Sequence, residues 1–335
     1  MQLSVLDQAP VIGNATPADA IAATIDLARA ADGLGFHRYW LAEHHGLAGL
    51  AIASPEVLLA RLGAETRRIR LGTGGMLLPY VAPFRLIEQF RMLEALYPGR
   101  IDLGLGRAPG GHPRTALAVA DGHYDSGKEH MRKIAEISAM LRDDIPHGHP
   151  YYGHRANPER VGAPQLWMLG STIDGAEIAA MLGLRFALAH FINAREAAQV
   201  GMHYRAQFRE GHEAAPHLAI AVLAVVAADR TEAQRIERAL LLRWALIGLG
   251  EDRPVPTLEE ADLHEFTTQQ MLMADRERPR AIVGEANEVA DRIAELAQAS
   301  RADEVITLSL APSYALRLRT IEALAAAFSL RALAA

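Results

Sequence analysis

The chain has 335 residues, half of them hydrophobic, and its 34 basic and 40 acidic side chains leave a formal net charge of −6. That composition describes a globular protein with a large core, and its mild acidity gives no reason to expect nucleic acid or an anionic membrane as a partner. Cysteine is absent, which excludes disulfides, thiolate metal sites and a cysteine nucleophile. No secretory leader and no apolar run of membrane-spanning length is present, so we expect a cytoplasmic protein.

Strands and helices are predicted to alternate through the first third of the chain. Thr16-Pro17 and Ser54-Pro55 combine an N-cap residue with a first-turn proline, as is typical of helix starts. Short apolar runs between the helical stretches have the length and composition of strands. The predicted strands cover residues 2–10, 37–45, 69–79 and 100–106, and the predicted helices cover 16–35, 54–66 and 82–99.

The second half of the chain repeats the pattern less regularly. Between its elements, residues 251–280 break the rhythm with Pro254, Pro256 and mixed polar sequence, so we expect an insertion before the last strand. The predicted strands cover residues 163–171, 185–191, 216–228 and 302–310, and the predicted helices cover 172–184, 193–210, 230–250, 287–300 and 312–328.

The order of these elements predicts the fold class. Strands that alternate with helices and are apolar throughout indicate a parallel sheet covered by helices on both faces. About eight such strands, in a chain longer than the roughly 250 residues of a typical barrel, favour an α/β fold closed as a (β/α)8 TIM barrel over an open doubly wound sheet. No flexible linker divides the chain, so residues 1–335 are predicted to form a single domain.

The carboxyl ends of the strands form the active-site face of such a barrel, and Glu43-His44-His45 is the densest titratable group at one of them. This position favours a functional role for His44, and a hydrogen-bonded structural histidine is the alternative. His45 points to the other face if the chain stays extended. A second histidine group, at 147–149 and His154, has no accompanying carboxylate, so we predict no metal site.

A phosphate site is predicted from two further strand ends. Arg107 follows the glycine-broken fourth strand, and Gly170-Ser171-Thr172 begins a helix directly after the fifth. Backbone N–H groups and hydroxyls at a helix start favour an anion, and a guanidinium can grip a phosphate. Taken singly, Arg107 is equally explained as a solvent-facing arginine, and Ser171-Thr172 as an ordinary N-cap. Together they suggest a phosphate-tailed cofactor across the barrel mouth, without a Walker loop or a GxGxxG motif.

Gly74 and Gly75 interrupt a buried strand between Leu71 and Met76. Glycine weakens a strand because it costs backbone entropy and offers no side chain to pack. The pair predicts a bulge that lets a flat ligand approach the backbone. Two glycines required only by packing are an equally good explanation of this stretch alone.

Four segments resemble the bacterial-luciferase-like family of flavin-dependent monooxygenases. They are LGFHRYWLAEHHG, IRLGTGGMLLPYVAPFRLIEQFRMLEALYPGRIDLGLGRAPG, LWMLGSTIDGAEIAAMLGL and ADEVITLSLAPSYALRLRTIEALA, and together they cover nearly the whole chain in the right order. The resemblance implies a (β/α)8 barrel that takes reduced FMN from a separate flavin reductase, reacts with O2, and often forms a homodimer.

The resemblance also assigns candidate roles to single residues. Gly74 and Gly75 fall where the family has a cis peptide bulge behind the flavin ring, with Met76 beside it. His44 matches a histidine near the reacting edge of the flavin and is our catalytic candidate. The candidates for cofactor binding are Gly74, Gly75, Met76, Glu88, Arg107, Gly170, Ser171 and Thr172, of which Glu88 matches a carboxylate near the bulge.

The sequence departs from the family pattern at two places. Gly106 stands where light-emitting members carry a reactive cysteine, so no thiol chemistry is implied. Asp174-Gly175 replaces further hydroxyls after Ser171, which alters the expected details of phosphate binding.

We therefore expect an FMN-dependent monooxygenase acting on a small organic substrate. His44 would donate or accept a proton, because the ordinary pKa of histidine lies near working pH. An F420-dependent hydride-transfer oxidoreductase is the runner-up, although the acidic F420 tail should need more basic groups than Arg107 and Lys128. A flavin-binding protein without turnover and a metal-dependent hydrolase are the further alternatives.

The substrate pocket is expected to be lined by variable loops. One candidate is the stretch at 110–125, which contains His112, His123 and Tyr124, and the other is the insertion at about 251–280. Neither stretch carries a motif typical of one substrate class.

Overall fold

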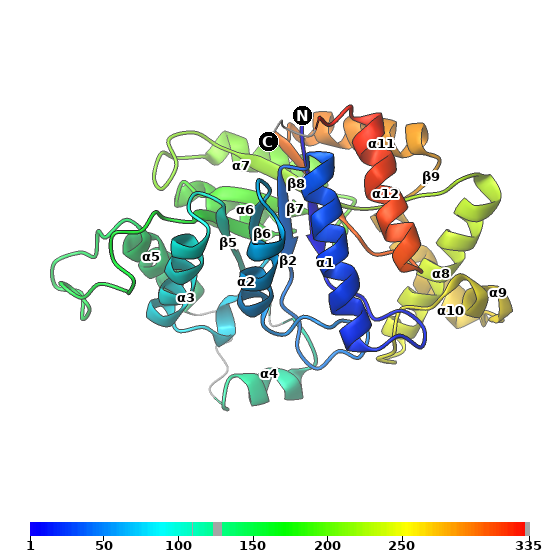
Figure 1. Cartoon of the computed structure of the whole chain (residues 1–335), viewed down its shortest axis with the longest axis horizontal. Helices are drawn as coiled ribbons and strands as arrows, with labels where there is room; N and C mark the ends of the chain where they lie inside the picture. The colour runs from blue at the N-terminus through cyan, green and yellow to red at the C-terminus, as the bar shows by residue number, and fades with distance from the viewer. Residues whose placement is uncertain (109, 123–128, 332–335) are drawn as a thin grey trace.

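Strands and helices alternate as predicted, and eight parallel strands close into a barrel (Figure 1). The structure, a computed structural model, describes residues 1–108, 110–122 and 129–331. β10 pairs with β8 on one side and with β1 on the other, so the sheet closes on itself and the predicted (β/α)8 barrel is confirmed. The barrel strands are β1 (Gln2–Asp7), β2 (Arg38–Leu41), β3 (Arg70–Thr73), β5 (Ile101–Gly106), β6 (Gln165–Gly170), β7 (Arg185–Ala189), β8 (Leu218–Val226) and β10 (Glu304–Leu308).

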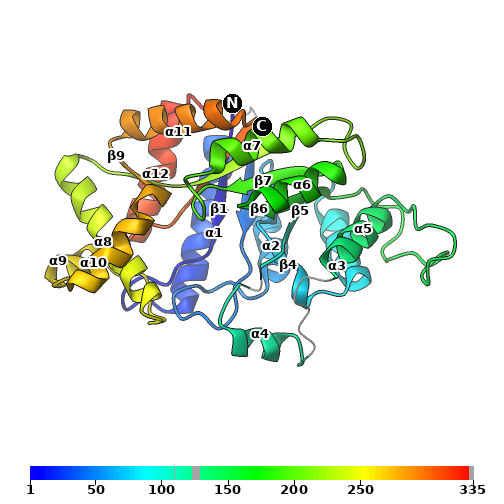
Figure 2. The same cartoon turned by 180° about the vertical axis from the view of Figure 1, so that it is seen from behind.

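Helices cover the outside of the barrel, as Figure 1 shows from one side and Figure 2 from behind. α1 illustrates how they are delimited, because a Thr16–Asp19 capping box begins it and Gly35 ends it in the left-handed region at φ 87°. Within the described residues, no helix is long and apolar enough to cross a membrane. The covering helices are α1 (Pro17–Leu34), α2 (Pro55–Glu65), α3 (Pro83–Leu96), α6 (Ile173–Met181), α7 (Ala197–Gln207), α8 (Arg230–Gly248), α11 (Ala286–Ser300) and α12 (Tyr314–Ala327).

β8 shows why the strands are apolar throughout. Successive side chains of a strand point to opposite faces, and in a barrel both faces are buried. One set packs in the core between strands and helices, and the other set fills the barrel interior. The first set in β8 is Leu218, Ile220, Val222 and Ala224, and the second is Ala219, Ala221, Leu223 and Val225.

The stretch predicted as one strand over 69–79 is divided in the structure. β3 ends at Thr73, β4 (Met76–Leu77) pairs with β5, and a 3-10 turn, η1 (Leu78–Tyr80), follows. The Gly74–Gly75 peptide bond between β3 and β4 is cis, as the sequence and the family resemblance predicted. The strand predicted over 37–45 is also shorter, because pairing of β2 with β3 ends at Leu41 and Thr73.

Further elements lie in the long connections. α4 (Pro113–Val119) and α5 (His130–Leu141) follow β5, and both views show α4 at one end of the barrel, apart from the helical layer. The stretch expected as an insertion holds α9 (Leu258–Leu263), α10 (Thr268–Glu277) and η2 (Arg278–Arg280), and α9 and α10 pack on α8.

A short strand after η2, β9 (Ala281–Gly284), was not predicted. It pairs with the last four residues of β8, of which Leu223 also pairs with β10. Four residues are too few to show a periodic pattern, so only the nine-residue length of β8 hinted that a second partner was needed.

The amino ends of the barrel strands hold a layer of paired charges. Arg38 bonds to Asp102 at 2.6 Å and to Glu304 at 2.7 Å, and all three side chains are buried. Arg70 bonds to the other oxygen of Asp102 at 2.7 Å, and Trp40 Nε1 donates to Asp102 at 2.9 Å. Every charge in this layer therefore has a partner of opposite sign within hydrogen-bond distance.

Candidate active site

His44 lies three residues beyond β2, on the face formed by the carboxyl ends of the strands. Burial lowers the pKa of His44 to about 4; the backbone of Ala42 opposes this, and the charge of Arg243 adds to it. Among the described residues, the buried Nδ1 atom of His44 has no hydrogen-bond partner. The imidazole is therefore neutral at neutral pH, which corrects the expectation that its pKa lies near working pH.

Glu43 and His45 form a separate pair that supports the loop carrying His44. His45 Nε2 lies 2.7 Å from Glu43 Oε1, and the ring of His45 packs edge-on against Tyr80 at 5.6 Å between centroids. Glu43 Oε2 accepts a hydrogen bond from Leu77 N at 2.7 Å. Burial raises the pKa of Glu43, and these two contacts oppose the rise. The pair thus ties the loop to β4. Because β2 ends at Leu41, the extended strand on which the opposite orientation of His44 and His45 was predicted does not reach them.

The structure brings Arg107 to the start of α6. A Cβ added at Gly175 would lie 3.2 Å from Arg107 Nη2, and a Cβ added at Gly170 would lie 3.5 Å from Gly175 Cα. Thr172 caps the helix by accepting a hydrogen bond from Gly175 N at 3.4 Å. Among the described residues, Arg107 has no hydrogen bond and no ion pair. A free cation and the first turn of a helix therefore lie side by side, which suits an anion.

Two neighbouring residues, Asn193 and Asp174, affect the turn at the start of α6. The carbonyl of Ser171 accepts a hydrogen bond from Asn193 Nδ2 at 3.1 Å, so the turn is held from β7's side. Asp174 lies in the first turn of α6 with an exposed side chain. Its carboxylate therefore remains in solvent near the helix start, where any bound anion would also lie.

Gly74 and Gly75 are both required by the packing of the barrel. A Cβ at Gly74 would lie 2.7 Å from Leu6 Cδ1, and a Cβ at Gly75 would lie 2.8 Å from Gly104 O. The packing explanation of the pair is therefore sufficient, and a side chain at Gly75 would disturb the barrel itself. Met76 is 4% exposed and belongs to the core between strands and helices, so its side chain is committed to packing.

Glu88 lies in the second turn of α3, in the outer layer. Its Oε1 accepts a hydrogen bond from Asn157 N at 3.3 Å, in the loop that follows α5. The structure thus gives this carboxylate a partner in that loop and records no contact between it and His44, Arg107 or Gly75 among the described residues.

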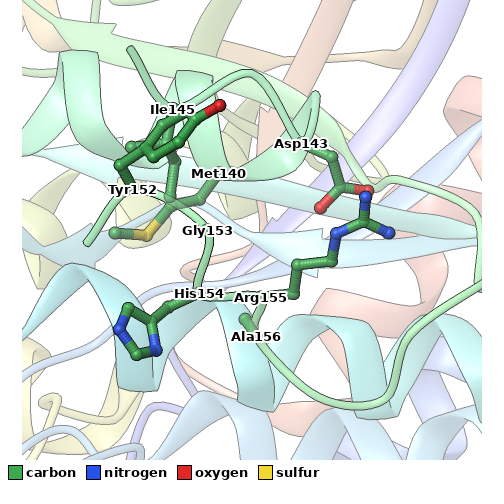
Figure 3. Close-up of a pocket in the computed structure, with 8 residues that line it drawn as sticks. All are labelled: Met140, Asp143, Ile145, Tyr152, Gly153, His154, Arg155 and Ala156. Carbon is green, nitrogen blue, oxygen red and sulfur yellow. The ribbon is translucent and has the colours of Figure 1, made fainter. Parts of the chain in front are cut away.

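The second histidine group does not converge. His149 Nε2 lies 3.3 Å from Glu136 Oε1, and His147 stacks on Tyr152 at 3.9 Å between ring centroids. Within residues 1–108, 110–122 and 129–331, no three His, Asp or Glu side chains lie close enough together to hold a metal ion. A cavity of about 200 Å³ beside this loop is lined by Met140, Asp143, Tyr152, His154 and Arg155 (Figure 3), away from the strand ends.

A cavity of about 410 Å³ lies next to the His44 loop. Its walls come from the loop after β2, the start of the α4 segment, the end of α8 and the stretch that follows it. Arg243 of α8 lines this cavity, and the sequence analysis missed it because nothing local distinguishes it from the other arginines of that helix. The lining residues include Gly46, Leu47, Leu50, His112, Leu246, Ile247, Asp252, Pro254 and Pro256.

His112, in the stretch expected to line the substrate pocket, does reach this cavity, and so do residues 251–254 and Pro256 of the expected insertion. His123, Tyr124 and Lys128 lie outside the described residues.

Comparison with known proteins gives the family. A family model described as luciferase-like monooxygenase matches residues 1–304. The uncharacterized protein YceB of Bacillus subtilis is 38% identical over 309 residues, which is 92% of this chain and 93% of that protein. The N-acetyl-S-alkylcysteine monooxygenase of Bacillus subtilis is 34% identical, over 88% of this chain and 89% of that protein.

The crystal structure of apo-MsnO8 resembles this chain with a TM-score of 0.91 and 37% identity, over 98% of this chain and 99% of that one. The likeness extends over the whole barrel and its connections, so the fold and the family agree. The chain belongs to the luciferase-like monooxygenase family.

Proposed function

We propose that this protein is a two-component monooxygenase that uses reduced FMN and O2 on a small organic substrate. The observation that carries the proposal is the unpaired Arg107 against the first turn of α6, at the mouth of a barrel of this family. This arrangement suits the phosphate of FMN, because the N–H groups and dipole of the helix start add to the charge of the guanidinium.

Gly175 keeps that position open. A Cβ there would lie 3.2 Å from Arg107 Nη2, so a larger residue would displace the guanidinium or the anion, whereas a Cβ at Gly170 would meet the ring of Phe186 at 3.1 Å. Ser171 and Thr172 add hydroxyls to the same turn, and Thr172 can donate its proton while it accepts from Gly175 N. The exposed Asp174 keeps the site from being strongly cationic.

His44 is proposed as the catalytic residue. When bound, reduced FMN supplies the two electrons that place one atom of O2 on the substrate and the other in water. A neutral imidazole at the mouth can accept a proton or a hydrogen bond at Nδ1, the atom that has no partner among the described residues. The Glu43–His45 pair holds the loop that positions it.

Gly74, Gly75, Met76 and Glu88 are proposed to lie around the flavin. The two glycines and Met76 are explained by packing, so their contribution to the cofactor would come from backbone atoms. A separate flavin reductase and a homodimer are proposed by family resemblance.

The relative named N-acetyl-S-alkylcysteine monooxygenase suggests that a thioether or a similar small molecule is a reasonable first substrate to test. An F420-dependent oxidoreductase is the second candidate. The polyanionic tail of F420 would need several cations beside the α6 turn, and the cation identified beside that turn is Arg107.

Binding and reaction with O2 test the proposal together. We expect tryptophan fluorescence to report FMN binding that is tighter than riboflavin or F420 binding. Mixing the photoreduced complex with oxygenated buffer and a thioether should yield oxygenated product. Tighter binding of F420, or flavin binding without any product from a panel of small organic substrates, would contradict it.

A further inference from the structure

Arg243 is a charged side chain at the mouth that the proposed flavin chemistry does not use. Among the described residues it donates no hydrogen bond and forms no ion pair, and burial lowers the pKa of its guanidinium to about 10, which the charge of Asp252 opposes. A partly buried arginine normally has an acidic partner, because desolvating an unpaired cation is costly. Arg243 remains charged at neutral pH without one.

The acidic groups nearest to it are committed elsewhere. Both carboxylate oxygens of Asp252 accept a hydrogen bond from Ala48 N, at 2.8 and 2.9 Å. Glu251 pairs with Arg253 at 2.9 Å on the exposed rim. Of the two arginines that line the 410 Å³ cavity, Arg243 is therefore the one without an ion-pair partner among the described residues.

The cavity wall around Arg243 is mostly apolar. Gly49 lies beside the guanidinium: a Cβ there would be in ordinary van der Waals contact with Arg243 Nη1 at 3.5 Å, and only 2.7 Å from the carbonyl oxygen of Arg253. The walls beyond it are aliphatic, and a volume of about 410 Å³ suits a small ligand. The aliphatic side chains that form them are Leu47, Leu50, Leu246, Ile247, Pro254 and Pro256.

The cavity also adjoins the proposed reaction centre. Gly46 and Leu47 of its wall follow His44 in the same loop, and the charge of Arg243 acts on His44 directly. A molecule anchored in the cavity would therefore have its other end near His44.

We infer that Arg243 is the carboxylate-binding residue of the substrate site, and that the substrate class is a small organic acid with an apolar chain. This rests on the proposed function for the reaction itself. A guanidinium fork matches the two oxygens of one carboxylate, and the apolar walls match the rest of the molecule. A phosphate or other polyanion fits less well, because Glu251 and Asp252 lie on the same rim and Arg253 is already paired.

Calorimetric titration of the full chain with matched acid and amide probes tests the inference. The pairs are hexanoate with hexanamide, and N-acetyl-S-propylcysteine with its primary amide. In at least one pair we expect the acid to bind roughly 10- to 100-fold more tightly, the range for a hydrogen bond to a charged group. Equal affinity within both pairs, or no binding of either acid, would overturn the inference.

Variants of Arg243 and Arg253 test which arginine causes the preference for the acid. Arg243→Met should abolish the preference for the acid, and Arg243→Lys should keep part of it, because lysine keeps the charge but loses the fork. Arg253→Met is the matched control, since Arg253 lines the same cavity but is paired with Glu251, and it should keep the full preference. An undiminished preference in a folded Arg243→Met protein would place the carboxylate elsewhere.

FMN titration of the same samples separates this inference from the proposed function. Acid binding that depends on Arg243 in a protein that does not bind FMN would refute the flavin proposal and leave the carboxylate site standing. FMN binding and turnover without an acid preference would refute the carboxylate site and leave the flavin proposal standing.

Discussion

The two ends of the barrel differ in whether all of their arginines have an acidic partner. At the amino ends of the strands, Arg38 is bonded to both Asp102 and Glu304, and Glu304 keeps a pKa of about 2 although burial opposes its charge. At the carboxyl ends, Arg107 and Arg243 have no partner among the described residues. Every charge of the amino-end layer is therefore paired, whereas the carboxyl end holds both a buried pair, Asp7 with Arg317, and two arginines without a partner in the described part of the chain.

The difference shows which end serves stability and which end serves a ligand. Buried charges that pair across several strands cost desolvation but lock those strands together, whereas buried charges without partners cost desolvation with nothing gained in the folded chain. Such groups are expected where a ligand completes them, which in a parallel barrel is the carboxyl-end face.

Replacing His44 should give the largest change at the carboxyl end. We expect His44→Ala to lower turnover roughly 100- to 10,000-fold, the usual contribution of a proton-transfer group, with FMN affinity changed only a few-fold. Stopped-flow measurement of flavin reoxidation and product yield checks this. With a pKa of about 4, His44 should also contribute no titration to the wild-type rate between pH 6 and 8. Unchanged kinetics in the variant would make His44 a structural histidine.

Replacing Arg38 should give the largest change at the amino end. Arg38→Met leaves Glu304 without its arginine and removes one of two arginines from Asp102, so we expect a loss of about 3–5 kcal/mol in the free energy of unfolding. Urea unfolding measures it. Arg107→Met is the control and should stay within about 0.5 kcal/mol of wild type, because it breaks no pair. Equal losses in both variants would remove the contrast between the ends.

Replacing Arg107 should weaken cofactor binding and leave the stability of the fold unchanged. We expect Arg107→Ala to weaken FMN binding by about 1.5–3 kcal/mol, the range for a hydrogen bond to a charged group, and to leave riboflavin binding unchanged. Parallel fluorescence titrations with the two flavins measure this. An equal loss for both would show that the guanidinium does not contact the phosphate.

As the pH falls, the groups at the carboxyl end should lose their contribution to the free energy of unfolding before those at the amino end. Burial lowers the pKa of both His44 and His190, which follows β7, to about 4. Between pH 6.5 and 4 the unfolded chain binds protons that the folded chain does not, so stability should fall as pH falls, by up to roughly 1.4 kcal/mol per pH unit for each histidine. Glu304 stays ionised over that window and loses its contribution only below pH 4.5.

Urea midpoints at pH 7 and pH 5 check this order. His190→Asn should reduce the difference between the two midpoints, and His203→Asn, on the exposed side of α7, should not. A wild-type midpoint that does not change between these pH values would contradict the prediction.

Much of the fold could be predicted because its signals are local. The alternation of apolar strands with capped helices indicated the barrel, and the Gly74–Gly75 pair marked the break between β3 and β4. β9 escaped prediction, since its four residues are explained only by the length of a strand more than fifty positions earlier.

The candidate site also has residues that the sequence predicts and residues that it does not. His44, Arg107 and the turn at 170–172 stand out in the sequence, because each lies within three residues of a strand end. The sequence therefore determined the candidates that lie near strand ends, but not Arg243, which α8 brings to the cavity.

Only the tertiary structure decided what state those residues are in. Burial, a property of the whole fold, lowers the pKa of His44 and makes it neutral. Pairing is equally non-local: Arg38 bonds to a carboxylate 266 positions away, and Arg243 forms no ion pair with any of the described residues. Charge in a protein has its effect through distance and desolvation, and neither is encoded by neighbours along the chain.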